Sequence, residues 1–64
     1  MKNNLRTTRE DLGLTQEQVA RASGVGVRYY QALESGKSIP GVKHATNIAR
    51  ALKTSIEALW PIGK

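Results

Sequence analysis

The sequence contains no cysteine and only one histidine, His44. Without cysteine the chain has no disulfide bond and offers no thiolate to a metal ion, and a lone imidazole does not make a metal site. No run of about 18 apolar residues occurs, and no apolar segment follows the first residues, so neither a membrane-spanning helix nor a signal peptide is predicted. We therefore expect a soluble, cytoplasmic protein that binds no metal, no cofactor and no small-molecule ligand.

The chain is short. Its 64 residues leave room for a single domain, residues 1–64. A domain of this size buries only about 60% of the surface of its unfolded chain, so its stability is marginal unless a disulfide, a metal or a partner subunit adds to it. Because the sequence offers neither of the first two, we expect a second subunit to contribute.

Basic residues outnumber acidic ones. Ten Lys and Arg residues against five Asp and Glu residues give a formal net charge of +5. This balance is expected of a protein that meets a polyanion, and DNA, RNA and an acidic membrane surface all qualify. A hydrophobic fraction of 39%, with charges spread along the chain, predicts a folded domain rather than a disordered tail.

No segment alternates apolar and polar residues as a half-buried strand does, so the chain is predicted to be all-α. Glycine and proline divide it into five predicted helices, over about residues 4–12, 16–23, 27–35, 42–52 and 55–60. The side chains expected to face the core recur at helical spacing: Leu5, Arg9, Leu12, Val19, Ala20, Ser23, Tyr30, Leu33, Glu34, Val42, Ala45, Ile48, Ala49, Leu52, Ile56, Leu59 and Trp60.

Several helix ends are marked in the sequence. Thr15 and Gln18 form a capping-box pattern, in which each side chain bonds the backbone N–H of the other residue, and this predicts the start of the second helix. The first helix has Asn3 or Asn4 as its candidate cap, and Thr7 with Glu10 is a competing capping box that would start the helix later. A glycine expected in the left-handed conformation follows each of the first three helices: Gly13, Gly24 and Gly36.

Only three residues separate the second and third helices, so the two helices must cross steeply, and Ala20 is small enough to allow their close approach. The residues around this turn resemble the XRE-type helix-turn-helix of phage repressor and Cro proteins. The resemblance rests on Leu14-Thr15-Gln16-Glu17-Gln18-Val19-Ala20, Gly24-Val25, Tyr30, Leu33-Glu34-Ser35-Gly36-Lys37 and Pro40.

This resemblance implies a compact five-helix bundle of the lambda repressor-like type, with its helix-turn-helix at about residues 16–35. It also implies that the second helix crosses the backbone of double-stranded DNA while the third lies in the major groove. The source of such a protein is expected to be a bacterium or a phage. Two residues depart from the family pattern. Gly26 replaces a capping Ser or Thr, and Lys53 replaces the glycine that closes the fourth helix.

Four residues of the third helix are candidate base contacts. The guanidinium of Arg28 matches the O6 and N7 acceptors of guanine, although a phosphate contact is its alternative. Val27 and Ala32 align with base-contacting positions and are expected to meet thymine methyl groups, with core packing as the rival role for Val27 and helix propensity for Ala32. Gln31 has two candidate roles, reading adenine or bonding a phosphate.

The resemblance also implies contacts to DNA phosphates. Gln16 lies at the start of the second helix, where free N–H groups favour an anion. Lys37, with the backbone amides of Ser35 and Gly36, is expected to form a second phosphate clamp. Tyr29 is expected to bond a phosphate through its hydroxyl, whereas Tyr30 is expected in the core.

Arg9 and Glu34 both fall on predicted buried faces, so the two opposite charges are expected to form a structural ion pair that links the first helix to the third, as in the family. Near the end of the chain lies an apolar group with two candidate roles, lining of the core or a dimer interface: Ile56, Leu59, Trp60 and Ile62. His44 is expected to be solvated or to cap the fourth helix.

No enzyme motif is complete. Gly36-Lys37-Ser38 resembles a phosphate-binding loop but has Gln31 where that loop needs glycine, and no nucleophile stands with the lone histidine. We therefore expect a DNA-binding transcriptional regulator, most simply a repressor that binds an inverted-repeat operator as a homodimer. The alternative is an RNA-binding or protein-interaction module, such as an antitoxin-like partner, built on the same bundle.

Overall fold

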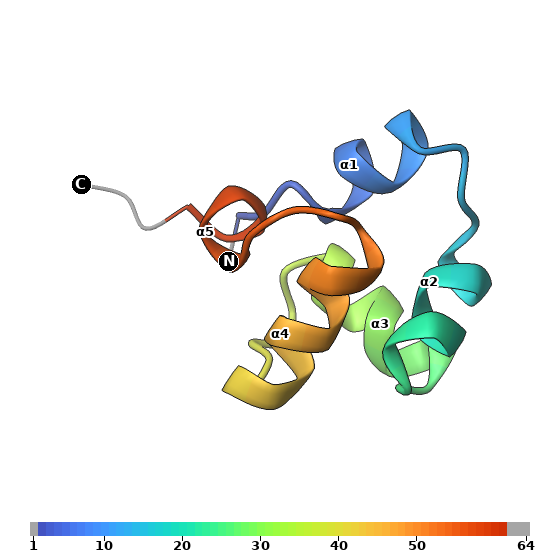
Figure 1. Cartoon of the computed structure of the whole chain (residues 1–64). Helices are drawn as coiled ribbons and strands as arrows, with labels where there is room; N and C mark the ends of the chain where they lie inside the picture. The colour runs from blue at the N-terminus through green and yellow to red at the C-terminus, as the bar shows by residue number, and fades with distance from the viewer. Residues whose placement is uncertain (1, 62–64) are drawn as a thin grey trace.

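Five α-helices account for most of residues 2–61, the part of the chain that the computed structural model describes (Figure 1). They are α1 (Leu5–Asp11), α2 (Gln16–Ser23), α3 (Val27–Glu34), α4 (Val42–Ala51) and α5 (Ile56–Leu59). No strand occurs within that range, so the prediction of an all-α five-helix bundle is confirmed. Over the same range, no helix has the length and apolar character needed to cross a membrane.

Side chains near the helix starts satisfy backbone donors. The capping box at α2 is confirmed, because the Thr15 side chain accepts from the N–H of Gln18 at 3.0 Å and the Gln18 side chain accepts from the N–H of Thr15 at 2.8 Å. At α1, Asn4 occupies the cap position, but the side chain of Asn3 is the one that accepts, from the N–H of Leu5 at 3.0 Å. The first helix therefore begins at Leu5 and not at the later capping box of Thr7 and Glu10.

Left-handed residues follow the first four helices. Gly13, Gly24 and Gly36 have φ values of 71°, 75° and 82°, which confirms the three predicted closures. Lys53 takes the same conformation after α4, with φ of 57°, although its Cβ makes this conformation unfavourable. The turn after α4 is therefore a strained position of this chain.

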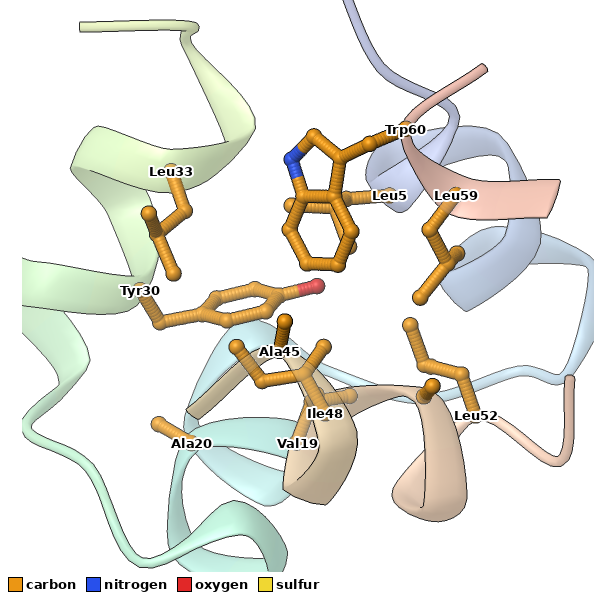
Figure 2. Close-up of a cluster of buried hydrophobic side chains, with 11 residues drawn as sticks. Leu5, Val19, Ala20, Tyr30, Leu33, Ala45, Ile48, Leu52, Leu59 and Trp60 are labelled. Atoms are coloured by element: carbon orange, nitrogen blue, oxygen red, sulfur yellow. The ribbon is translucent and has the colours of Figure 1, made fainter. Parts of the chain in front are cut away.

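The core forms where all five helices meet. Tyr30 is fully buried among side chains contributed by the other helices (Figure 2). The buried apolar residues are Leu5, Val19, Ala20, Tyr30, Leu33, Ala45, Ile48, Ala49, Leu52, Leu59 and Trp60. Contacts of α2 with both α3 and α4 hold the middle of the bundle together.

Three residues predicted to face the core are exposed: Leu12, Val42 and Ile56. Leu12 is 43% exposed because it lies past the last residue of α1, Asp11, where the chain turns at Gly13 and leaves the helix. Val42 is 81% exposed because the buried stripe of α4 begins one turn later, at Ala45.

The hypothesis that the end of the chain forms a dimer interface also needs correction. Leu59 is fully buried and Trp60 is 5% exposed, so both line the core of one subunit and offer no surface to another. The reason is a long-range contact, because the N–H of Asn4 donates to the carbonyl of Leu59 at 2.8 Å and fixes α5 against the start of the chain. Ile56 keeps 37% of its surface exposed, and Ile62 lies outside the described residues.

We predict that Lys53→Gly raises the free energy of unfolding by about 0.5–1 kcal/mol, because glycine relieves the left-handed strain at a small cost in chain entropy. Thermal and urea unfolding measure the difference. Lys53→Ala is the control, since it keeps the Cβ and should change stability by less than about 0.5 kcal/mol. Equal stability of the glycine variant and the original chain would contradict the strain.

Candidate nucleic-acid interface

The turn between α2 and α3 fixes the direction of α3. Gly24 adopts the left-handed conformation, and the N–H of Val25 donates back to the carbonyl of Ala20 at 3.0 Å. Ala20 is 2% exposed, so its small side chain lets α3 approach α2 closely. Since α3 is eight residues long and its cap, Gly26, makes no side-chain bond, packing against α2 is what holds it in place.

A buried ion pair joins α1 to the end of α3. The Arg9 Nε lies 2.6 Å from a carboxylate oxygen of Glu34, and the side chains are only 12% and 6% exposed. Arg9 also donates to the carbonyl of Leu14 at 2.9 Å. The two residues predicted to pair are therefore brought together in the structure, and the pair also fixes the segment that leads into α2.

Gln16 extends this pair into a network. Its side-chain amide donates to the Glu34 carboxylate at 2.9 Å, and its carbonyl oxygen accepts from the Gln31 side chain at 3.2 Å. The first residue of α2 is thus bonded to two residues of α3. Sequence reasoning missed this role, because it treated Gln16 only as a phosphate ligand and nothing in the spacing relates residue 16 to residues 31 and 34.

The network sets the ionisation of Glu34. Burial opposes its ionised form, but hydrogen bonds from Arg9 and Gln16 outweigh burial, so the pKa of Glu34 is lowered. The same bond from Glu34 raises the pKa of Arg9. Because the folded pKa of Glu34 lies below the unfolded value of about 4.3, the pair stabilises the fold above that pH and the contribution is lost as the pH falls through the lowered value.

Tyr30 lies one turn before Glu34 and faces the core. Its hydroxyl is buried and has no hydrogen-bond partner in the part of the chain that the structure describes. Burial raises the pKa of Tyr30, and the charge of Glu34 adds to the shift. Tyr30 is therefore an un-ionised core residue, as predicted, and Tyr29 is the tyrosine of this pair that reaches the surface.

The side of α3 turned away from the core carries the predicted base-contacting residues, which we name the α3 face: Val27, Arg28, Gln31 and Ala32. Arg28 and Gln31 are exposed, and Ala32 is half-buried. Val27 is 37% exposed and does not belong to the buried cluster, so core packing is not its role. The structure thus brings these four side chains to one side of a helix that is fixed from behind.

The predicted amide clamp after α3 is wrong. The N–H of Ser35 donates to the carbonyl of Gln31 at 3.0 Å, and that of Gly36 donates to the carbonyl of Leu33 at 3.1 Å. Amides at the carboxyl end of a helix bond carbonyls of the preceding turn, and free amides occur only at the amino end. The side chain of Lys37, which is exposed, remains as the candidate phosphate ligand there.

The exposed charges of α3 and α4 have one sign, whereas the neighbouring α2 exposes a carboxylate, Glu17, which lines a pocket together with Val27 of the α3 face. From residue 18 to residue 56 the sequence contains one carboxylate, Glu34, and the ion pair with Arg9 both buries and neutralises it. The charged residues that α3, α4 and their flanking segments expose are all basic: Arg28, Lys37, Lys43, Arg50 and Lys53. Basic residues therefore predominate on α3 and α4, and such an excess of positive charge attracts polyanions.

Comparison with known proteins agrees with this geometry. The sequence profile of a helix-turn-helix family matches residues 5–59. An uncharacterized HTH-type transcriptional regulator of Methanothermobacter thermautotrophicus is 44% identical over 52 residues, which cover 81% of this chain and 75% of that protein. Proteins of the same description from Archaeoglobus fulgidus and Methanocaldococcus jannaschii are 37% and 38% identical over 60 residues, 94% of this chain and 86% and 91% of theirs.

We predict that Arg9→Met lowers the free energy of unfolding by about 3–5 kcal/mol at pH 7, because it leaves the buried Glu34 carboxylate without its partner. The difference should narrow as the pH falls, first because the buried Glu34 of the variant takes up a proton, and at lower pH because the original pair also loses its charge. Urea unfolding at several pH values measures both effects. A loss that stays constant with pH would show that packing, and not charge, was removed.

Proposed function

Because the chain belongs to the XRE-type helix-turn-helix family of DNA-binding transcriptional regulators, we propose that it recognises a specific double-stranded DNA operator and acts as a repressor. In this proposal α3 enters the major groove, and the start of α2 meets the DNA backbone. Repression is the simplest regulatory role, because a cytoplasmic protein bound at a promoter is enough to exclude RNA polymerase. Regulators of this family are generally not enzymes, and no catalytic step is proposed.

The main support for this function is the excess of exposed basic side chains on α3, α4 and their flanking segments. Five exposed basic side chains lie on α3, α4 and their flanking segments, while Glu34 is withdrawn into the ion pair with Arg9. DNA phosphates require such a surface, because contacts between basic residues and phosphates supply most of the binding that does not depend on sequence.

Base recognition is assigned to the four residues of the α3 face. Arg28 is exposed at the start of α3 and suits bidentate bonding to guanine. Gln31 is held by Gln16 at 3.2 Å, which limits its directions and suits it to one acceptor or donor in the groove. Val27 and Ala32 are apolar and suit contact with thymine methyl groups.

Phosphate binding is assigned to Gln16, Tyr29, Lys37 and the Ser35 hydroxyl. Gln16 is the first residue of α2, where the backbone N–H groups have no partner within the helix and favour an anion. Lys37 follows α3 directly, so it reaches the backbone beside the groove that α3 occupies. Ser35 already donates its hydroxyl to the carbonyl of Ala32 at 3.0 Å, which leaves it a weaker ligand than the other three.

A homodimer completes the proposal. One copy of α3 contacts one half-site, and two copies would bind half-sites about 34–36 Å apart on one side of the DNA. Of the interface residues predicted from the sequence, Ile56 has exposed surface within residues 2–61, whereas Leu59 and Trp60 do not. The dimer contact is therefore expected to involve the start of α5 rather than the tryptophan.

Two substitutions separate base contacts from phosphate contacts. We predict that Arg28→Ala weakens binding to the preferred operator by about 1–3 kcal/mol and relaxes preference at one base pair. Lys37→Ala should instead weaken binding to all sequences alike and reduce the salt slope by about one unit. Titration of operator and scrambled duplexes over a range of salt measures both. Equal losses on both duplexes for Arg28→Ala would reassign Arg28 to a phosphate.

Selection from a pool of random duplex DNA tests the function as a whole. The purified protein should enrich an inverted repeat with half-site centres about one helical turn apart, with guanine at the positions read by Arg28. A structured RNA competitor should not displace the enriched DNA. Failure to enrich any sequence, together with tight binding of the RNA, would replace the DNA-binding proposal with the RNA-binding one.

A further inference from the structure

Tyr29 and His44 form a contact between α3 and α4 beside the α3 face. Their rings meet edge to face, with centroids 5.3 Å apart and planes at 65°. The Nδ1 of His44 lies 3.4 Å from the hydroxyl of Tyr29, at the long end of the range for a hydrogen bond. His44 is exposed in the first turn of α4 and is the only histidine in the chain. Tyr29 is half-buried and packs against the core, whereas His44 is not part of the buried cluster.

We propose that His44 positions the Tyr29 hydroxyl for a DNA phosphate and, when protonated, adds a phosphate contact of its own, so that DNA binding takes up a proton. This inference rests on the proposed DNA-binding function. It assigns His44 a role in the interface, whereas the sequence alone indicated only a solvated or capping residue.

The direction of the hydrogen bond explains the dependence on protonation. In the neutral tautomer that carries its proton on Nε2, Nδ1 accepts the hydroxyl hydrogen of Tyr29, and that hydrogen is then not directed to a phosphate. In the other neutral tautomer Nδ1–H already donates to Tyr29, so protonation reverses the bond only for the first. When the imidazole is protonated, Nδ1–H donates to the Tyr29 oxygen instead. The hydroxyl hydrogen of Tyr29 then turns outward and can donate to a phosphate oxygen, while the imidazolium contributes a positive charge next to it.

The charged residues next to His44 in residues 35–43 are basic. Tyr29 is the titratable group that faces it from α3, its neighbour on α4 is Lys43, and the segment between the two helices, residues 35–41, has Lys37 as its one charged residue. No carboxylate among the described residues forms an ion pair with His44. A DNA phosphate is therefore the group that favours the imidazolium, and histidine is the side chain that titrates between about pH 5 and 8.

Fluorescence anisotropy tests the inference, with the full chain and a labelled random-sequence duplex of about 30 base pairs, long enough for two half-sites. The label must be a rhodamine, whose emission does not change in this pH range. Affinity should rise about three- to tenfold between about pH 8 and pH 5.5, since a tenfold change corresponds to a pKa difference of one unit between free and bound protein. The salt slope should steepen by about one unit at the lower pH.

Three variants locate the effect. His44→Asn keeps a polar side chain that does not titrate, so its affinity should stay flat as the pH falls from 8 to 5.5. Tyr29→Phe should lose part of the gain at low pH and keep the part due to charge. Lys43→Gln is the matched control, because it removes an adjacent charge without a titratable group and should weaken binding equally at both pH values. Thermal unfolding of each variant checks that the fold is retained.

Binding that does not depend on pH, or a pH dependence that His44→Asn leaves intact, would overturn the inference while leaving the DNA-binding function in place. Absence of binding to duplex DNA at every pH and salt concentration would overturn the proposed function and this inference with it.

Discussion

The ion pair between Arg9 and Glu34 is the interaction on which the rest of the interface depends. It connects α1 to the last residue of α3, and through Leu14 and Gln16 it also connects to the start of α2. Short helices such as these are marginal on their own in water. A charge-assisted bond inside the bundle therefore sets how α3 is presented, in addition to the apolar contacts that hold it.

The same pair determines the charge of the surface. Glu34 is the one acidic residue between residues 18 and 56, and its burial leaves the exposed sides of α3 and α4 with basic groups only. A buried ion pair often stabilises a fold no more than well-packed apolar residues of similar size would. Here it serves a second purpose, since it removes a carboxylate from the side of the molecule proposed to meet phosphate groups and keeps Gln16 and Gln31 aligned with one another.

The errors of sequence reasoning have specific physical causes. Helical periodicity gives the face on which a residue lies but not where the helix ends or stops contacting the core. It therefore predicted that Leu12 and Val42 are buried, although both lie at helix ends and are exposed. The sequence does not show which residues pack against an apolar side chain near the end of the chain, so a dimer interface was one of two candidate roles for Trp60. In the structure the segment that carries Trp60 lies against the start of the chain, and Leu5 lies beside Trp60. The amides of Ser35 and Gly36 were assigned to phosphate without regard to the direction in which helix amides donate.

The sequence by itself determined the helix boundaries at Thr15, Gly24 and Gly36, the burial of Tyr30 and the excess of positive charge, because these depend on residue type and on spacing within one turn. It also determined the family. Tertiary structure alone decided that Gln16 bridges Glu34 and Gln31, and that Tyr29 meets His44. Those contacts join residues 15 to 18 positions apart, and a local pattern carries no information about which side chains the crossing of helices brings within hydrogen-bonding distance.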